Sequence, residues 1–355
     1  MTEEGTAGMA NGIAVIDISC SWEDGGDAKE DLVMKMYSDV RGALTTSGFF
    51  FVKGHRVSTE SMEGAMQCTR DFFRLESDIK EKYMPNKAAG DPPLGYSGKT
   101  IFLDPTMQSK PDTREQYKVG NDGYDKAYKT RCSSEIRSVS PPDKAFYWPE
   151  EEIRAGKIQS NFKHVLSNYF DDMRLLGHQL MKVICAALCI EYKPVFDDDE
   201  NANESCFDRP MHLLSMLRYD GTISDVSASL FGCGPHTDYG CLTILQLDPV
   251  VGGLEVFIEN QNGNADHTKE NSWLEINPVE GCFVVNAGEM LERWTNGIVK
   301  ASLHRVVSKS NTPRYSIPFF FEPNIDCNIG PLKSCLKTED KKYETIKVRT
   351  QNEKL

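Results

Sequence analysis

Long apolar runs are absent from this chain of 355 residues, and no stretch reaches the roughly 18 apolar residues that a membrane-spanning helix requires. The first 12 residues are acidic and glycine-rich and lack the apolar segment of a secretory signal. A basic surplus is also absent, since 40 lysines and arginines stand against 53 aspartates and glutamates, for a net charge of −13. We therefore expect a cytoplasmic protein that binds neither nucleic acid nor membranes.

The 11 cysteines form no CxxC framework of the kind that zinc modules and redox motifs carry. Cys185 and Cys189 lie in an apolar helical pattern, which is typical of buried thiols. Because a cytoplasmic location favours reduced cysteines, we expect free thiols rather than disulfides. No internal repeat or low-complexity tract is present in the sequence, which leaves an ordinary globular chain long enough to bury a large core.

Hydropathy patterns divide the chain into five regions. Apolar residues recur at helical spacing over 31–47, 58–75 and 161–190, whereas 13–19 and 48–55 have the composition of strands. The segment 84–150 shows little periodicity and is rich in Gly, Pro and Asp, which is typical of functional loops. The expected regions are a disordered tail (1–12), strands, helices and substrate-covering loops (13–150), a long helix and linker (151–210), a β-rich core (211–325), and a C-terminal tail or helix (326–355).

Short β-type runs follow one another closely in the second half of the chain. Examples are "CLTILQL", "GLEVFIE", "CFVVNAG" and "RYSIPFFFEP", with Gly, Pro, Asn and Asp between them. Many short strands at close spacing are typical of a β-sandwich or barrel. The sequence therefore predicts a mainly β fold with flanking helices.

The stretch "GCGPHTDYGCLTILQL" (232–247) places a histidine and an aspartate two residues apart, just before an apolar run. In a strand, His236 and Asp238 would project from the same face. Alone, such a pair is more typical of a polar turn, but His304 follows in another β-type run. Two imidazoles and one carboxylate form the open facial triad of non-haem Fe(II) oxygenases. A structural zinc site would close all four positions, and neither Cys233 nor Cys241 has a zinc-finger spacing.

Arg314 and Ser316 stand two residues apart in the last β-type run. A guanidinium binds a carboxylate through two parallel hydrogen bonds, and a hydroxyl can add a third. The two side chains would share a strand face, so this run offers an anchor for a carboxylate within reach of the metal ligands. A dicarboxylate that chelates iron at one end and meets Arg314 at the other fits this arrangement.

Taken in order, these motifs resemble the iron(II)- and 2-oxoglutarate-dependent dioxygenases of the isopenicillin-N-synthase-like superfamily. The resemblance extends from about Ile13 to Pro323 and includes "IAVIDIS", "GFFFVKGH", "REQYKVG", "KASLHRVV" and "PRYSIPFFFEP". It implies a double-stranded β-helix (jelly-roll) core with a helix-rich N-terminal part. It also implies that His236, Asp238 and His304 bind Fe(II), with no further catalytic residue beyond the metal ligands.

By the same resemblance, Arg314, Ser316 and Tyr219 would bind 2-oxoglutarate. The family's common Asn-Tyr-Tyr-Pro stands here as "LRYD" (217–220), and its Gly-Asp as Gly288-Glu289, which we interpret as a structural position. The implied cofactor is Fe(II), the co-substrates are 2-oxoglutarate and O₂, and ascorbate is a candidate reductant. The implied reaction is hydrogen abstraction from a small metabolite, typical of secondary metabolism, giving hydroxylation, desaturation or ring closure with release of succinate and CO₂. The expected assembly is a monomer.

Substrate contacts are predicted from strand alternation and from the loop region. Phe320 and Glu322 lie an even number of residues after Arg314, so they would share its strand face and point into the mouth of the barrel. Core packing of Phe320 and a charge at the strand end for Glu322 explain the two residues equally well. Counting from the iron ligands predicts that Leu242 and Ile244 line the pocket wall. The candidates in the region before the core are Tyr96, Lys99, Arg114 and Tyr117. Lys99 and Arg114 would pair with an acidic substrate or remain surface charges.

Three other functions remain compatible with the sequence. The first is an Fe(II) oxidase of the same fold that does not consume 2-oxoglutarate, since such enzymes also carry an Arg-x-Ser pair. The second is a non-catalytic binding protein, which has no need of three metal ligands. The third is a zinc hydrolase, which leaves Arg314 and Ser316 unexplained.

Overall fold

The computed structural model describes residues 8–22, 30–86, 94–99, 110–120, 148–190, 206–207, 210–259, 272–336 and 341–348. The helices are η1 (Ser19–Trp22), α1 (Glu30–Thr46), α2 (Thr59–Phe73), α3 (Ser77–Glu81), α5 (Glu150–Arg154), α6 (Phe162–Ala187), η4 (Val226–Ala228), α7 (Glu289–Trp294) and η5 (Lys333–Cys335). The strands of the first two thirds of the chain are β1 (Gly8–Ala10), β2 (Ile13–Asp17), β3 (Phe49–Lys53), β4 (Gly95–Ser97), β5 (Arg114–Gly120), β6 (Leu213–Tyr219) and β7 (Cys233–His236). The remaining strands are β8 (Leu242–Leu247), β9 (Leu254–Ile258), β10 (Ser272–Ile276), β11 (Phe283–Ala287), β12 (His304–Val306), β13 (Arg314–Phe321), β14 (Asn328–Ile329) and β15 (Ile346–Lys347).

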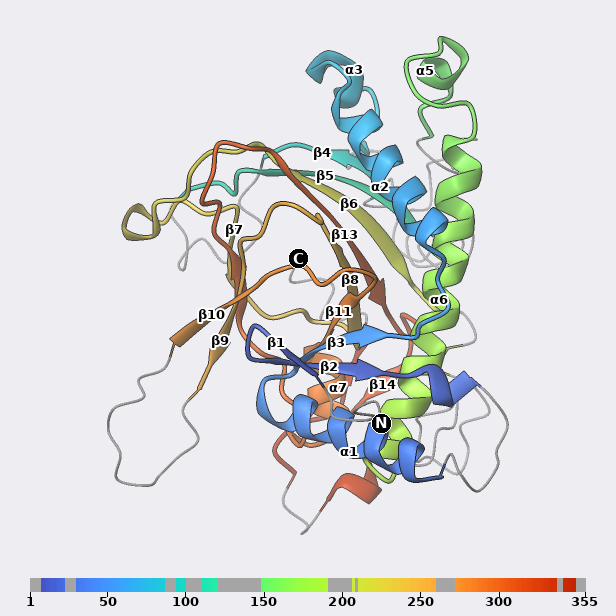
Figure 1. Cartoon of the computed structure of the whole chain (residues 1–355), viewed down its shortest axis with the longest axis vertical. Helices are drawn as coiled ribbons and strands as arrows, with labels where there is room; N and C mark the ends of the chain where they lie inside the picture. The colour runs from blue at the N-terminus through green and yellow to red at the C-terminus, as the bar shows by residue number, and fades with distance from the viewer. Residues whose placement is uncertain are drawn as a thin grey trace, which may run out of the picture.

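Two facing sheets form the centre of the molecule (Figure 1). The larger has nine strands in the order β1-β2-β3-β11-β8-β13-β6-β5-β4, and the smaller has four in the order β10-β9-β12-β7. The central pairs β11–β8, β8–β13 and β13–β6 are antiparallel. Helices α1, α2 and α6 cover the outer face of the larger sheet (Figure 1). This arrangement confirms the predicted mainly β fold with a jelly-roll core and flanking helices.

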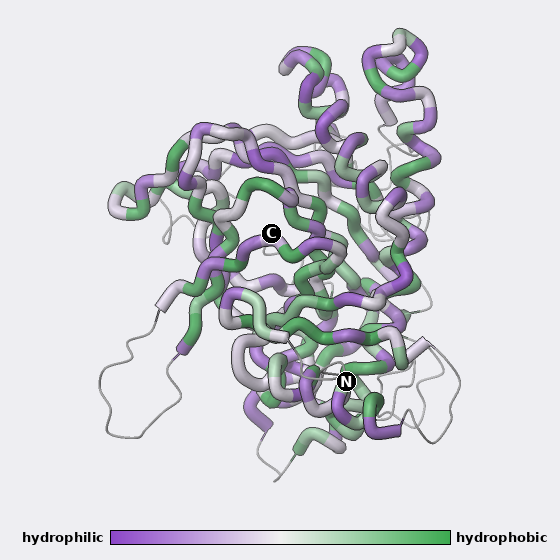
Figure 2. Tube along the Cα trace, in the orientation of Figure 1, coloured by the Kyte–Doolittle hydropathy of each residue, from purple (hydrophilic) through white to green (hydrophobic). Residues whose placement is uncertain are grey.

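Hydrophobic clusters lie on both faces of the larger sheet, as the residues of β13 illustrate. Residues Ile317, Phe319 and Phe321 of this strand pack in the cluster that the larger sheet shares with α2 and α6. Side chains such as Phe51 and Val306 form a second cluster between the two sheets. Because successive strand residues point to opposite faces, the even-numbered residues of β13 face the space between the sheets. Figure 2 shows hydrophobic residues concentrated on the central strands, while α2 and α6 carry both hydrophobic and hydrophilic residues.

Most elements that the periodicity predicts are present. The helices predicted over 31–47, 58–75 and 161–190 are α1, α2 and α6, and the strands predicted over 13–19 and 48–55 are β2 and β3. No described helix meets the length and apolarity needed to cross a membrane. The expected tail differs, because residues 8–10 form β1 and pair with β2 across a tight turn.

The stretch 84–150 is more regular than predicted where the structure describes it. Residues 95–97 and 114–120 are β4 and β5, which extend the larger sheet beyond β6. The segment after residue 325 is also ordered in its described parts, where β14 and β15 pair and bury Ile329 and Val348. Both segments are stabilised by pairing with distant parts of the chain, which local periodicity does not reveal.

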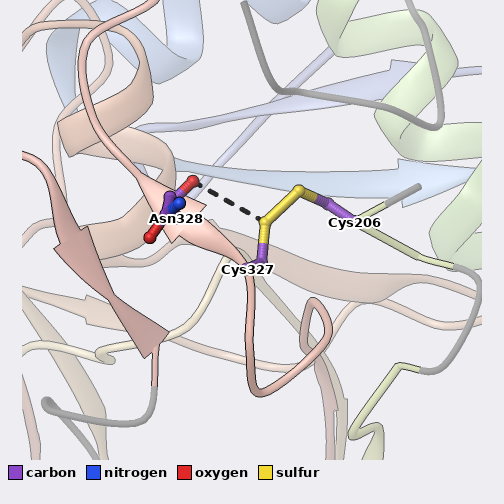
Figure 3. The surroundings of a disulfide bond; sticks show 3 residues. All are labelled: Cys206, Cys327 and Asn328. Atoms are coloured by element: carbon purple, nitrogen blue, oxygen red, sulfur yellow. Dashed lines mark hydrogen bonds between the residues drawn. A yellow bond between two sulfur atoms is a disulfide. The ribbon is translucent and has the colours of Figure 1, made fainter. Parts of the chain in front are cut away.

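The expectation of free thiols is wrong for one pair, because a disulfide joins Cys206 and Cys327 (Figure 3). The chain before β6 and the chain after β13 meet here, and the amide of Asn324 donates to the carbonyl of Cys206 at 2.7 Å. The two cysteines are 121 residues apart, so only the tertiary fold brings them together. The other eight described cysteines are free thiols.

Candidate metal centre and co-substrate site

His236, Asp238 and His304 come together at one end of the smaller sheet. His236 ends β7 and His304 begins β12, and the two are direct cross-strand partners. Asp238 lies in the turn after β7, and its Oδ1 is 3.8 Å from Nε2 of His236 and 3.7 Å from Nε2 of His304. One ligand atom from each residue lies within 4.8 Å of the other two. Among the described residues, this is the one such group of His, Cys, Asp or Glu.

The rings of His236 and His304 both have a fixed orientation. Nδ1 of His236 lies 2.8 Å from the carbonyl of Gly234, and Nδ1 of His304 lies 3.1 Å from that of Ser302. A backbone carbonyl accepts a hydrogen bond from a protonated Nδ1, so Nε2 of both rings is left as the electron-pair donor toward a metal.

The carboxylate of Asp238 is held on one side only. Oδ2 accepts hydrogen bonds from the Thr243 hydroxyl at 2.5 Å and from the Asn286 amide at 2.7 Å. Oδ1 therefore faces the two histidines. The sequence analysis does not predict the contacts of Thr243 and Asn286 with Asp238. Thr243 could be found from the sequence, because in a strand that begins at Leu242 it points to the opposite face from Leu242.

Helix α7 supports the turn that carries Asp238 (residues 237–241, the metal-binding turn). The amide of Glu289 donates to the carbonyl of Asp238 at 2.8 Å, and the Thr237 hydroxyl donates to the Glu289 carboxylate at 2.5 Å. Gly288 packs so closely that a Cβ there would lie 2.2 Å from the carbonyl oxygen of Gly240. These contacts support the interpretation of Gly288 and Glu289 as a structural position.

Burial and the neighbouring charges set the protonation of the three ligands. Burial lowers the pKa of His304 to about 4, and the neighbouring His236 contributes to this shift. Burial also lowers the pKa of His236. Burial alone would raise the pKa of Asp238, but the two imidazoles and the hydrogen bonds from Thr243 and Asn286 bring it below its ordinary value. Two neutral imidazoles and a carboxylate are the donor set that a divalent transition metal requires.

Arg314, Ser316 and Tyr219 form a second group beside the first. Arg314 and Tyr219 are cross-strand partners on β13 and β6, and the guanidinium lies 4.9 Å from the centre of the tyrosine ring. Nη1 of Arg314 donates to Oγ of Ser316 at 3.4 Å. Arg314 is 3 % exposed, its Nε has no hydrogen-bond partner, and none of the ion pairs among the described residues includes it. A buried guanidinium in this state is a ready site for an anionic ligand.

Arg114 and Lys99 already have acidic partners. Arg114 lies on β5, on the other side of Tyr219, and its side chain is 13 % exposed. Its Nε is 3.3 Å from Asp112, whose other oxygen accepts from the amide of Gly234 at 3.0 Å. Arg114 is thus a largely buried neighbour of Tyr219, whereas Lys99 is half exposed and pairs with Asp220.

Tyr96 and Tyr117 do not line the space between the sheets. Both belong to the cluster under the helices, where the Tyr117 ring centre is 4.2 Å from that of Phe72. The Tyr96 hydroxyl donates to the buried carboxylate of Glu115 at 2.7 Å. The prediction of these two tyrosines as substrate contacts is therefore wrong, because they occupy the helix-facing positions of β4 and β5.

Leu242 and Ile244 are likewise on the helix side of the sheet, contrary to the predicted pocket wall. The chain turns between Asp238 and Leu242, so alternation counted from the metal ligands does not continue into β8. Phe320 follows the predicted alternation of β13 and faces the space between the sheets, whereas Glu322 lies just beyond the end of that strand. His164 and His178 lie on α6 and take no part in the metal group.

Two family models match the chain. The model of the 2OG-Fe(II) oxygenase superfamily matches residues 185–323, and that of the non-haem dioxygenase in morphine synthesis N-terminal region matches residues 13–138. The chain is 31 % identical over 301 residues to the 2-oxoglutarate-dependent dioxygenase caaD of Aspergillus niger, covering 84 % of this chain and 80 % of that protein. It is 32 % identical over 329 residues to the homoarginine-6-hydroxylase 2-ODD-233 of Oryza sativa subsp. japonica, covering 89 % and 87 %.

A similar solved structure is that of a full-length Neurospora crassa protein in complex with alpha-KG. It is 26 % identical in sequence, covers 95 % of this chain and 94 % of its own, and superposes with a TM-score of 0.73. The similarity therefore extends over both sheets and the helices that cover them.

Proposed function

This chain belongs to the 2OG-Fe(II) oxygenase superfamily and is a 2-oxoglutarate-dependent dioxygenase, and we propose that His236, Asp238 and His304 hold its iron. The donor set fits, because two neutral imidazoles and one carboxylate occupy three positions of a metal and leave the others open. When bound there, Fe(II) supplies the oxygen activation that couples the decarboxylation of 2-oxoglutarate to hydrogen abstraction from a substrate.

The observation that carries the co-substrate assignment is Arg314, a buried guanidinium with no acidic partner among the described residues. A dicarboxylate chelating the metal would bring its distal carboxylate to this group. Ser316 is positioned to donate a further hydrogen bond, and the Tyr219 ring beside the guanidinium holds it in place. These three side chains thus orient the co-substrate, while the cluster between the sheets excludes water from it.

The substrate of this proposal is a small metabolite that enters between the sheets beside Phe320 and Glu322. The outcome is hydroxylation, desaturation or oxidative ring closure, with release of succinate and CO₂ and with ascorbate as a reductant. One relative is named as a homoarginine-6-hydroxylase and another only as a 2-oxoglutarate-dependent dioxygenase, so the names of the relatives do not fix the substrate of this chain. A cytoplasmic monomer completes the proposal.

The test is succinate release from the Fe(II)-loaded enzyme across fractionated metabolite pools, followed by the mass of each product. Gain of one oxygen atom identifies hydroxylation, and loss of two hydrogen atoms identifies desaturation or ring closure. Oxygen uptake without succinate would instead identify an oxidase of the same fold. His304→Ala serves as the inactive control, because it removes one metal ligand.

A further inference from the structure

Glu322 has a buried carboxyl group without a partner. The residue is 4 % exposed, and neither carboxyl oxygen has a hydrogen bond among the described residues. The other buried glutamates of the described chain are all paired: Glu115 with Lys80, Tyr96 and Arg218, Glu152 with Tyr83, and Glu255 with Arg305 and Lys309. An unpaired buried acid is costly, and such groups in native proteins commonly mark a functional site.

The carboxyl group lies against the metal-binding turn. Glu322 directly follows β13, and continuing the strand alternation from Arg314 and Ser316 would direct it away from the helix side, where Phe319 and Phe321 pack. A Cβ at Gly240 would lie 1.9 Å from Oε1 of Glu322, so this glycine leaves the space that the carboxyl group occupies. Burial raises the pKa of Glu322 to about 8, and the nearby carboxylate of Asp238 adds to the shift.

When ionised, the Glu322 carboxyl group carries a negative charge that the other groups of the loaded site do not balance. The metal and Arg314 together balance Asp238 and a dianionic co-substrate, and Arg114 is balanced by Asp112. No described lysine or arginine forms an ion pair with Glu322, and the barrel-facing Lys118 of β5 lies opposite Ser215 on β6 rather than beside Glu322. Burial favours the protonated carboxyl group in the empty site, and a cation that arrives with the substrate would compensate the negative charge that Glu322 carries once ionised.

We propose that Glu322 is the substrate-recognition carboxylate of this site and that the substrate carries a guanidinium group. Both carboxyl oxygens lack partners, and a guanidinium satisfies both at once through two parallel N–H···O bonds. The contact would place the substrate beside the metal-binding turn, within reach of the iron. This inference rests on the proposed function, because it assigns the substrate class of the same site.

The test uses short alkylguanidinium ions and the matching alkylureas, which have nearly the same shape but no charge. Each probe is titrated by calorimetry, without oxygen, into the enzyme loaded with Fe(II) and 2-oxoglutarate. We expect guanidinium probes to bind at least about tenfold more tightly than the ureas, which is about 1.4 kcal/mol. Glu322→Gln should abolish the difference without changing the affinity for 2-oxoglutarate.

Two further variants keep the result interpretable. Glu322→Asp keeps the charge and should retain part of the preference even if Glu322→Gln is poorly folded. Glu255→Gln changes a buried glutamate that is already paired with Arg305 on the smaller sheet and should leave the preference unchanged. Equal binding of guanidinium and urea probes, or a preference that survives in Glu322→Gln, would overturn the assignment. If 2-oxoglutarate itself fails to bind in the presence of Fe(II), the proposed function fails instead.

Discussion

The hydroxyl of Thr243 donates a 2.5 Å hydrogen bond to Oδ2 of Asp238 and so fixes which carboxylate oxygen faces the two histidines. Thr243→Val keeps the shape of the side chain and removes this bond. Because groups that orient a metal ligand contribute strongly to affinity, we expect Fe(II) to bind about 10–100-fold more weakly. Competition with a metal-responsive dye measures the change. Thr45→Val, near the C-terminal end of α1, is the control, and equal affinities in both variants would contradict the role of Thr243.

Arg314→Lys should weaken 2-oxoglutarate binding while leaving metal affinity unchanged. A lysine keeps the charge but cannot form two parallel bonds with a carboxylate. The loss of one charge-assisted bond of about 1.5–3 kcal/mol corresponds to a rise in Kd of about 10–150-fold. Calorimetry of the Fe(II)-loaded protein without oxygen measures it. Arg305→Lys, at an arginine paired with Glu255, is the matched control and should bind 2-oxoglutarate normally.

Gly177→Ala should destabilise the fold even though alanine favours helices. A Cβ at this position of α6 would lie 2.2 Å from the ring of Phe321, which faces the helix from β13. Overpacking of this kind costs about 1–3 kcal/mol. Gly42→Ala in α1 meets no atom within 4 Å and should instead raise stability by about 0.5–1 kcal/mol. Urea unfolding of both variants measures the contrast, and a stabilised Gly177→Ala would show that α6 and β13 are packed less closely.

The pH dependence of stability should differ between the metal-free wild type and Glu322→Gln. Burial raises the pKa of Glu322 from 4.5 to about 8, so between these values the folded state holds a proton that the unfolded state has lost. The contribution of Glu322 to the free energy of unfolding is therefore fully present below about pH 4.5 and is lost as the pH rises toward 8. Between these values the free energy of unfolding falls by up to about 1.4 kcal/mol per pH unit. The glutamine variant lacks this slope. Parallel unfolding curves from pH 5 to 8 would show that Glu322 is not buried as described.

The sequence was sufficient for the elements that have strong local periodicity. Helices α1, α2 and α6 follow their apolar spacing, and the ordered motifs bring His236, Asp238 and His304 into one group, with Arg314 beside them. The helices are predictable because their apolar spacing lies within one element. The site is predictable because the resemblance to the dioxygenases covers the whole core.

The wrong predictions concern features that no local pattern contains. The alternation of side chains between the two faces of a sheet, for example, holds only within one strand. Alternation counted from Asp238 predicts the wrong face for Leu242, because the count restarts in the turn after Asp238. Tyr96 is predicted in a loop region, whereas it lies on β4. The Cys206–Cys327 bond and the contact of Glu322 with Gly240 join distant segments, and no local pattern encodes them.

The central claim is that one Fe(II) bound by His236, Asp238 and His304 creates the site at which 2-oxoglutarate binds. Its most direct test is an oxygen-free titration of 2-oxoglutarate into wild-type protein with and without Fe(II), repeated with Asp238→Ala. We predict one 2-oxoglutarate per chain, bound tightly only in the presence of Fe(II), and no such dependence on Fe(II) in Asp238→Ala. Binding of equal strength with and without Fe(II), or metal-dependent binding that survives in Asp238→Ala, would contradict the account.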